Sequence, residues 1–160
     1  MPELPIRAFE PQDREAVIAL HWELNRHEQT VSGDRALERE DAVACLADDE
    51  KQMASRGGVA LVALIDGAVA GYLCCVLTNG GPFLRAELRR QAYVTTLVVG
   101  EPYRGRGVAA ALLGEAERYA RGQGVAALGV GVLAGNAGAE RLYQRFGFAP
   151  HAVEMVKRLR

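Results

Sequence analysis

Residues 97–113 have the sequence LVVGEPYRGRGVAAALL. An apolar, β-branched run leads into a glycine-rich segment, and apolar residues after Gly107 recur at the spacing of a helix packed on a sheet. The first amides of a helix have no acceptor within it, the helix dipole adds partial positive charge there, and glycine lets phosphate oxygens approach the backbone. We therefore expect a strand, a loop and a helix that hold a diphosphate at residues 105–110.

The common nucleotide motifs do not match this segment. No GKS or GKT follows the loop, so it is not a P-loop, and it lacks the three-glycine dinucleotide pattern with its downstream acid. Taken alone, RGRG is a weak signal, because glycine between a strand and a helix often only makes the turn. The assignment therefore depends on a second segment.

That second segment is NAGAERLYQRFGF, residues 136–148. Asn136 favours a helix N-cap and Gly147 a helix end, with Ala139, Leu142, Tyr143 and Phe146 at helical spacing between them. Residues 125–133, just before it, are predicted to form a strand.

Together the two segments resemble the GNAT N-acetyltransferase family. The family's coenzyme A loop has Arg or Gln, two residues, Gly, one residue, then Gly or Ala, and Arg104, Gly107 and Ala109 match it. By motif the resemblance covers residues 93–149, and by order of elements it extends over the whole chain. The matching downstream positions are Asn136, Ala139, Leu142, Tyr143, Gly147 and Phe148.

The resemblance implies a role for each matched residue. Acetyl-CoA is the implied cosubstrate, with no metal. Asn136 lies beside the cofactor, and Tyr143 lies near its sulfur and protonates the departing thiolate. Backbone groups for the pantetheine arm come from Leu97, Val98 and Val99. The diphosphate is held by the loop of Arg104, Gly105, Arg106, Gly107, Val108, Ala109 and Ala110.

The implied reaction is direct transfer in a ternary complex. A deprotonated amine attacks the thioester, a backbone donor stabilises the oxyanion, and an acid protonates the thiolate. A phenol with a pKa of about 10 stays protonated at neutral pH, which suits Tyr143. No acyl-enzyme is needed, so Cys45, Cys74 and Cys75 are expected to be buried free thiols, the last two on opposite faces of a strand.

The general base stays unassigned. Many relatives carry a carboxylate on the strand before the loop, or five residues before the asparagine; this chain has Tyr93, Val94, Thr95 and Thr96 in the first place and Gly131 in the second. A water relay through Thr95 is one alternative. His21 and Trp22 are expected to pack against the core from the first helix, and the alternative is that their segment lines an acceptor pocket. Glu101 adjoins the loop, and the acids and bases that could fold over the site are Glu23, His27, Glu28 and Glu87.

Periodicity predicts the rest of the fold. We expect a strand at 6–9, helices to residue 26 and over 34–53, a hairpin of strands 59–65 and 69–77 turning at Asp66-Gly67, a short turn within 83–91, and a strand at 93–99. Two final strands are expected from Phe148 onward and at 153–159. This is one α/β domain over residues 1–160, a GNAT-like fold with a mixed, mostly antiparallel sheet of about seven strands and about four helices.

Composition limits the partners. Hydrophobic residues make up 49% and charged residues 24%, with a net charge of −1, which is typical of a soluble globular protein. This balance lacks the positive field of nucleic-acid binding. No long apolar run or secretory signal occurs, so we expect a cytoplasmic protein without a membrane partner. A free sheet edge near the C terminus could pair with a second copy to give a homodimer.

Between residues 28 and 50 lie eight acids against two bases. The segment has two interpretations: a solvated helix face, or an acidic wall that attracts a polycationic amine.

The sequence therefore favours an N-acetyltransferase for a small-molecule or peptide amine. A coenzyme A-binding sensor or regulatory module without turnover is the alternative. A nucleic-acid-binding domain would need the arginines at 85, 89 and 90 to form one stripe with Lys157, Arg158 and Arg160.

Overall fold

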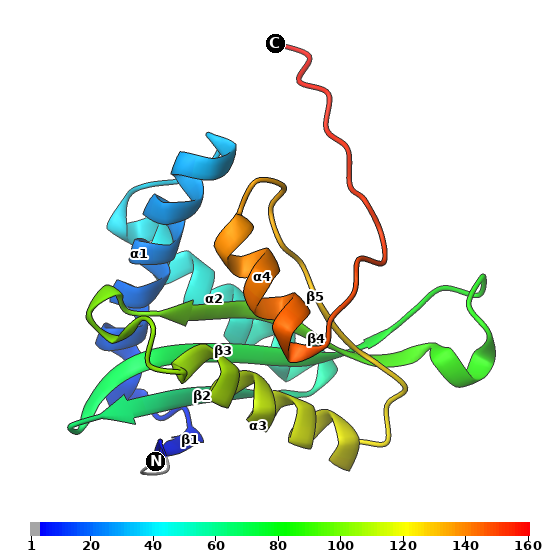
Figure 1. The fold of residues 1–160 in the computed structure, drawn as a ribbon, viewed down its shortest axis with the longest axis horizontal. Helices are drawn as coiled ribbons and strands as arrows, with labels where there is room; N and C mark the ends of the chain where they lie inside the picture. The colour runs from blue at the N-terminus through cyan, green and yellow to red at the C-terminus, as the bar shows by residue number, and fades with distance from the viewer. Residues whose placement is uncertain (1–3) are drawn as a thin grey trace.

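The computed structural model describes residues 4–160 and contains a five-stranded sheet in the order β1-β2-β3-β4-β5 (Figure 1). The strands are β1 (Ile6–Ala8), β2 (Gly58–Ile65), β3 (Ala68–Asn79), β4 (Arg90–Val99) and β5 (Leu128–Val130). The pairs β1–β2, β2–β3 and β3–β4 are antiparallel, whereas β5 is parallel to β4. Asp66 and Gly67 join β2 to β3 with φ of 50° and 78°. Positive φ at both central residues suits the predicted type I′ turn.

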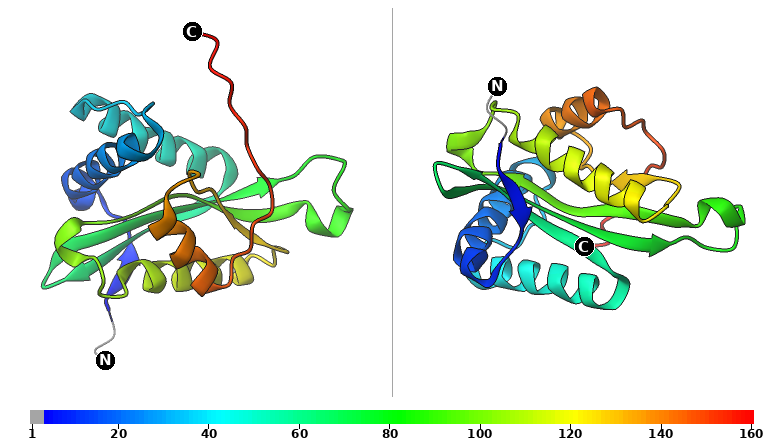
Figure 2. Two further views of the ribbon diagram at one scale, coloured as in Figure 1. Left: turned by 45° about the horizontal axis from the view of Figure 1, so that its top comes forward. Right: turned by 90° about the horizontal axis from the view of Figure 1, so that it is seen from below.

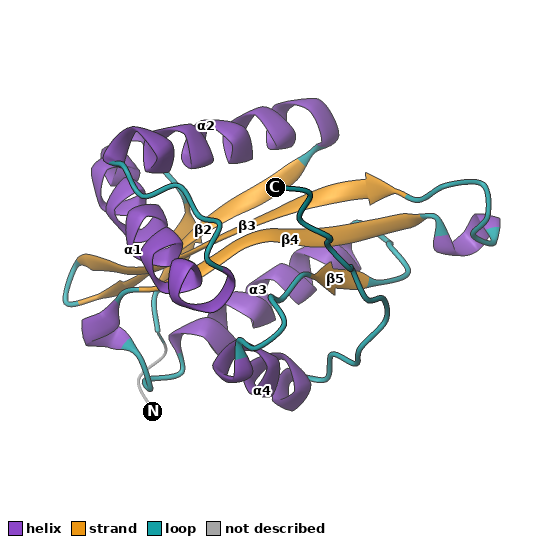
Figure 3. Cartoon of the chain, turned by 90° about the horizontal axis from the view of Figure 1, so that it is seen from above, coloured by secondary structure: helices purple, strands orange, loops and turns teal. Residues whose placement is uncertain are grey.

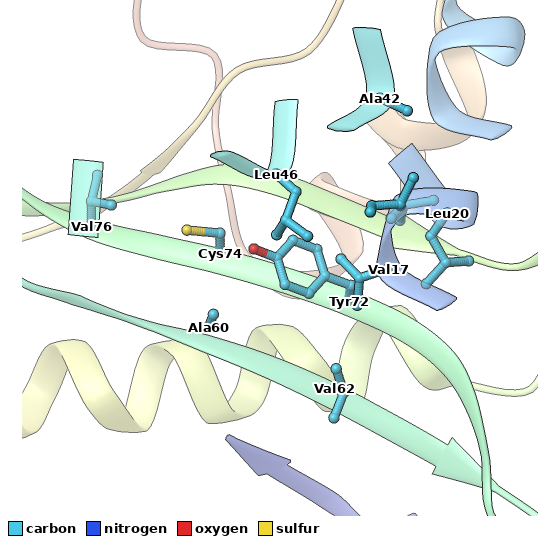
Figure 4. Packing of buried hydrophobic residues seen from close by; sticks show 11 residues of the cluster. Val17, Leu20, Ala42, Leu46, Ala60, Val62, Tyr72, Cys74 and Val76 are labelled. Atoms are coloured by element: carbon cyan, nitrogen blue, oxygen red, sulfur yellow. The ribbon is translucent and has the colours of Figure 1, made fainter. Parts of the chain in front are cut away.

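Helices cover both faces of the sheet. α1 (Arg14–Ser32) and α2 (Arg39–Arg56) lie on one face, while α3 (Val108–Gly122) and α4 (Ala137–Phe146) lie on the other (Figures 2 and 3). Each face has its own buried cluster, and Tyr72 lies in the first among Val17, Leu46 and Cys74 (Figure 4). Cys74 belongs to this cluster and Cys75 to the opposite one, as expected for neighbours in a strand.

The first two helices have different ends from those predicted. α1 continues past Arg26 to Ser32 and stops at Gly33, whose φ of 72° is left-handed. α2 begins at Arg39 rather than at residue 34, because Glu38 and Asp41 form a capping box in which the Asp41 carboxylate accepts the Glu38 N–H at 2.9 Å.

The C-terminal segment corrects the predicted strand count. The strand expected at 125–133 has only the three residues of β5, and the two final strands do not form, so the sheet has five strands rather than about seven. Residues after α4 run away from the sheet without regular structure (Figure 1). A strand needs a partner for its backbone groups, and Pro150 removes one donor. The exposed apolar side chains of this segment are Val153, Met155, Val156 and Leu159.

Three short 3₁₀ turns join these elements, at Pro11–Asp13, Ala86–Leu88 and Glu101–Tyr103. Over residues 4–160, each helix is too short or too polar to cross a bilayer.

Candidate active site

The site begins where β4 and β5 diverge. The two strands pair only from Ala92 to Val94 with Leu128 to Val130, whereas β4 continues to Val99. Within the described chain, this edge of β4 has no strand partner beyond Val94. The predicted pantetheine residues Leu97, Val98 and Val99 lie along it. The Val99 carbonyl already accepts the Arg104 Nε–H at 3.2 Å, so its oxygen is shared with the loop.

The glycine loop leads from β4 into α3. Gly105 and Gly107 have φ of 74° and 78°, and a Cβ at either position would meet no atom within 4 Å. The first bond of α3 runs from the Ala111 N–H to the Gly107 carbonyl at 3.0 Å. The amides of residues 108–110 therefore precede the hydrogen-bond ladder, beside an open surface. This arrangement fits the diphosphate of a cofactor.

Arg104 and Glu23 fasten the loop to α1. Arg104 Nη2 donates to Glu23 Oε1 at 2.7 Å, and the Glu101 N–H donates to the same oxygen at 2.8 Å. The Arg106 guanidinium lies 6.0 Å from the centre of the Tyr103 ring. Arg104 is therefore part of the loop's internal scaffold, while Arg106 has a weaker attachment.

α4 brings Asn136 and Tyr143 to the same side of the sheet as α3. Asn136 Oδ1 accepts the Ala139 N–H at 3.3 Å, which confirms the predicted N-cap. The Tyr143 ring lies 5.7 Å from that of Phe148 in an edge-on arrangement. Burial, together with the nearby Glu28 charge, raises the pKa of Tyr143 to about 12, so the phenol keeps its proton at neutral pH.

A buried polar cluster lies between α1, α2 and the sheet. The Asp49 carboxylate, only 3% exposed, accepts hydrogen bonds at Oδ1 from Thr95 at 2.9 Å and from Thr96 at 3.2 Å. Its Oδ2 accepts the Tyr72 hydroxyl at 3.1 Å. His21 Nε2 lies 3.3 Å from Oδ2 without a well-directed hydrogen bond to any described residue. The cluster reaches β4 where the pairing with β5 ends.

Sequence reasoning missed Asp49 because it lies in the acidic run. Its signal was nevertheless present: Ala42, Leu46 and Asp49 follow the i, i+4, i+7 spacing of one helix face, and all three are buried. His21 was expected to pack, and it does so beside the carboxylate.

The structure separates the candidate bases. Glu23 reaches the cofactor loop, whereas Glu28 pairs with Arg35 at 2.7 Å. Glu101 and His27 are exposed, and Glu87 lies in the turn between β3 and β4, 3.6 Å from Arg85. Glu23 and Glu101 both lie at the loop, where the Glu23 carboxylate is already engaged with Arg104 and the Glu101 amide. Glu28 lies near Tyr143 but is paired with Arg35.

Most of the remaining acids in residues 28–50 have local partners. Asp34 pairs with Arg35, Glu50 with Arg14, and Asp48 accepts from Gln52. Glu38 and Asp41 cap α2, as described above. These contacts favour the solvated-face interpretation over an acidic wall.

The two positions where relatives often carry a carboxylate lie together. A Cβ at Gly131 would be 2.7 Å from the Tyr93 hydroxyl oxygen, and one at Gly129 would be 3.0 Å from the Tyr93 ring. The tyrosine therefore fills the space that a side chain from residue 131 would need.

A diverging strand pair beside the first amides of a helix is an arrangement that fits an extended, phosphate-bearing cofactor. The family model described as "Acetyltransferase (GNAT) family" matches residues 14–148. The chain belongs to this family.

Similar proteins support the assignment. GCN5-related N-acetyltransferase 4, chloroplastic, from Arabidopsis thaliana is 36% identical over 102 residues, 64% of this chain but only 33% of its own length. A mutant of the BH1408 protein from Bacillus halodurans has a TM-score of 0.79 at 21% identity, covering 97% of this chain and 99% of its own. The structure of AAC(6')-Iy in complex with the bisubstrate analog CoA-S-monomethyl-acetylneamine has a TM-score of 0.69 at 20% identity, with 98% of each chain covered.

Proposed function

We propose that this protein transfers the acetyl group of acetyl-CoA to a primary amine of a small molecule or peptide. The observation that carries the proposal is the unpaired edge of β4, which leads through the glycine loop to the free amides at the start of α3. Such an edge accommodates an extended arm, and such amides accommodate a diphosphate. AAC(6')-Iy, which has a similar fold, binds a bisubstrate analog in which coenzyme A is joined to an acetylneamine.

Different residues of the chain have different roles in this proposal. Residues 105–110 hold the diphosphate, with Arg104 keeping the loop in place, and the backbone at 97–99 aligns the pantetheine arm. Asn136 begins the helix that lies beside the cofactor. When bound, acetyl-CoA supplies a thioester, and transfer to nitrogen gives an amide and a thiol. Tyr143 gives its proton to the departing sulfur and regains one from the attacking nitrogen.

The alternative is a sensor module that binds coenzyme A without turnover. It is favoured by the absence of a carboxylate at Thr95, Thr96 and Gly131, and by the Tyr93 hydroxyl that fills the space beside residue 131. Both proposals predict cofactor binding, so only turnover separates them.

The test is thiol release from acetyl-CoA with a panel of amines that includes a polyamine, an aminoglycoside, a monoamine and a peptide amine. We expect at least one amine to give release above the amine-free rate, with an acetylated product of the matching mass. Saturable acetyl-CoA binding without release by any amine would establish the sensor instead.

The free edge of β5 also supports a homodimer. A shallow hollow lined by Val125, Leu128, Phe146 and Phe148 lies beside this strand, and the segment after α4 exposes Met155 and other apolar side chains. We propose that this edge pairs with a second copy. Sedimentation velocity should then give a dimer that Met155→Lys weakens, and a monomer at all concentrations would contradict it.

A further inference from the structure

We propose that Asp49 is the terminal proton acceptor for the amine, reached through the hydroxyl of Thr95. The inference rests on the proposed acetyltransferase function and supplies the base that the strand carboxylates of other family members would provide. The hydrogen-bond distances around the buried Asp49 carboxylate support it.

A β-bulge gives Asp49 its two threonine partners. In the β3–β4 pair, Cys74 faces Thr96 and Cys75 faces Val94, so Thr95 is the extra residue. Neighbouring residues of a regular strand point to opposite faces, but at a bulge the alternation breaks. Both hydroxyls therefore reach Asp49 Oδ1, at 2.9 and 3.2 Å. Because of the bulge, the consecutive residues Thr95 and Thr96 both contact Asp49 of α2.

The same bulge marks the open end of the β4 edge. Pairing with β5 ends at Val94, so Thr95 is the first residue whose outer edge is free. A diphosphate at the start of α3 requires the arm to run back along residues 99 to 97, which brings its thioester end toward Thr95. The Thr95 hydroxyl thus stands between the reacting end and the buried carboxylate.

The hydroxyl groups of Tyr72, Thr95 and Thr96 donate to Asp49, which has no permanent cation beside it in the described chain. Facing it are His21 from α1, Tyr72 and Cys74 from β3, and the two threonines from β4; no Lys or Arg of the described chain lies within 4 Å. Burial and the Asp49 charge raise the pKa of Tyr72 and raise that of Cys74 to about 12. Tyr72 and Cys74 therefore keep their protons at neutral pH, and neither competes with Asp49 for the proton of the amine.

The proton balance is complete. An ammonium acceptor gives one proton to the Thr95 oxygen as the Thr95 hydroxyl passes its own proton to Asp49, which leaves a neutral amine, an intact threonine and a protonated carboxyl group. The amine nitrogen then forms the C–N bond as the C–S bond breaks, and its second surplus proton reaches the thiolate by way of Tyr143. Asp49 returns its proton to solvent after product leaves.

A purely structural role for Asp49, fastening α2 to β4, makes a different prediction. Structural damage lowers the rate for every acceptor by the same factor. A lost relay affects only acceptors that arrive protonated, and raising the pH toward the pKa of the amine compensates for it.

The test compares wild type with Asp49→Asn, which keeps the side-chain shape and an oxygen acceptor for the threonines. Asp48→Asn is the matched control, because it removes one charge from the neighbouring, exposed position of α2. With an aliphatic amine at pH 7, Asp49→Asn should lower kcat/KM by roughly 100- to 10,000-fold, and Asp48→Asn should leave it unchanged. The Asp49→Asn rate should then rise about tenfold per pH unit below the pKa of the amine, with acetyl-CoA affinity preserved.

Thr95 provides a second pair of variants that keeps the test decisive if Asp49→Asn does not fold. Thr95→Val should show the same pH-dependent loss, and Thr95→Ser should restore the rate. A folded Asp49→Asn with wild-type turnover, or a loss that is the same at every pH, would overturn the relay alone. A wild-type protein that releases no thiol with any amine would overturn the acetyltransferase proposal first.

Discussion

Arg104 donates to Glu23 across a distance of 2.7 Å, and this contact joins the glycine loop to α1, 81 residues earlier in the chain. The two side chains are 47% and 27% exposed, so the ion pair itself contributes only about 0–1 kcal/mol to stability. Its importance lies in where it holds the loop, because Arg104 also donates to the carbonyl of Val99 at the end of β4.

Replacing Arg104 by Ala should therefore weaken acetyl-CoA binding while leaving the fold intact. We expect the dissociation constant to rise roughly 10-fold, from the loss of loop order and of one positive charge near the phosphates. Arg106→Ala removes an equal charge whose only described attachment is to Tyr103, and calorimetric titration should show a smaller effect for it. Equal losses in the two variants would mean that charge alone matters.

Gly107→Val tests the position of the diphosphate. A side chain there meets no neighbouring atom but takes the open surface beside the α3 amides, and its left-handed backbone costs about 1–2 kcal/mol. Gly33→Val is the control, since Gly33 also has a left-handed φ, of 72°, and open surroundings at the end of α1. Both variants should melt at similarly reduced temperatures, but only Gly107→Val should lose at least about 10-fold in acetyl-CoA affinity. Comparable affinities would place the phosphates elsewhere.

Tyr143→Phe removes the proposed acid and keeps the ring that contacts Phe148. Turnover should fall roughly 10- to 1000-fold, with cofactor binding preserved. Because the pKa of Tyr143 is raised to about 12, its ionisation should produce no loss of activity between pH 7 and 10. The unfolded chain releases this proton near pH 10, so the contribution of Tyr143 to the free energy of unfolding should decrease as the pH rises from about 10 to 12. Wild-type turnover in the variant, measured where chemistry is rate-limiting, would leave Tyr143 as a packing residue.

The cysteines should be slow to react in the native protein. Burial raises the pKa of Cys74 to about 12 and that of Cys75 to about 11, whereas Cys45 is only half-buried. With an aromatic disulfide reagent at pH 8, Cys45 should react first, and the other two at least about 100-fold more slowly. All three should react at once in denaturant. Rapid native labelling of Cys74 or Cys75 would reopen the possibility of an acyl-enzyme.

The sequence predicted the elements whose signals are local. Gly107 and the apolar spacing after it placed the start of α3, and Asp66-Gly67 placed the hairpin between β2 and β3. The two final strands were wrong because β propensity does not determine whether a segment reaches a sheet edge, and the edge offered by β5 is only three residues long. The end of α1 was misplaced because the helix continues past Arg26 to Gly33, whose left-handed φ stops it.

The candidate site also has parts that the sequence could predict and parts that it could not. The loop and Asn136 could be found from spacing, since a helix start is determined by a few consecutive residues. The contacts of Asp49 could not be found, because the bulge that turns both threonines toward it depends on the register between β3 and β4. From the sequence, only the position of Asp49 on the buried face of α2 could have been predicted.

Amide chemical shifts can locate acetyl-CoA on the protein directly. Titration of ¹⁵N-labelled protein should produce the largest perturbations at the amides of residues 105–110, followed by those of residues 97–99, with the amide of Gly33 unchanged as an internal reference. Saturation at the same sites by coenzyme A would show that the phosphates, and not the acetyl group, dominate binding. No perturbation at millimolar cofactor, or perturbations centred on the arginines of residues 85–90 instead of the loop, would contradict the central claim.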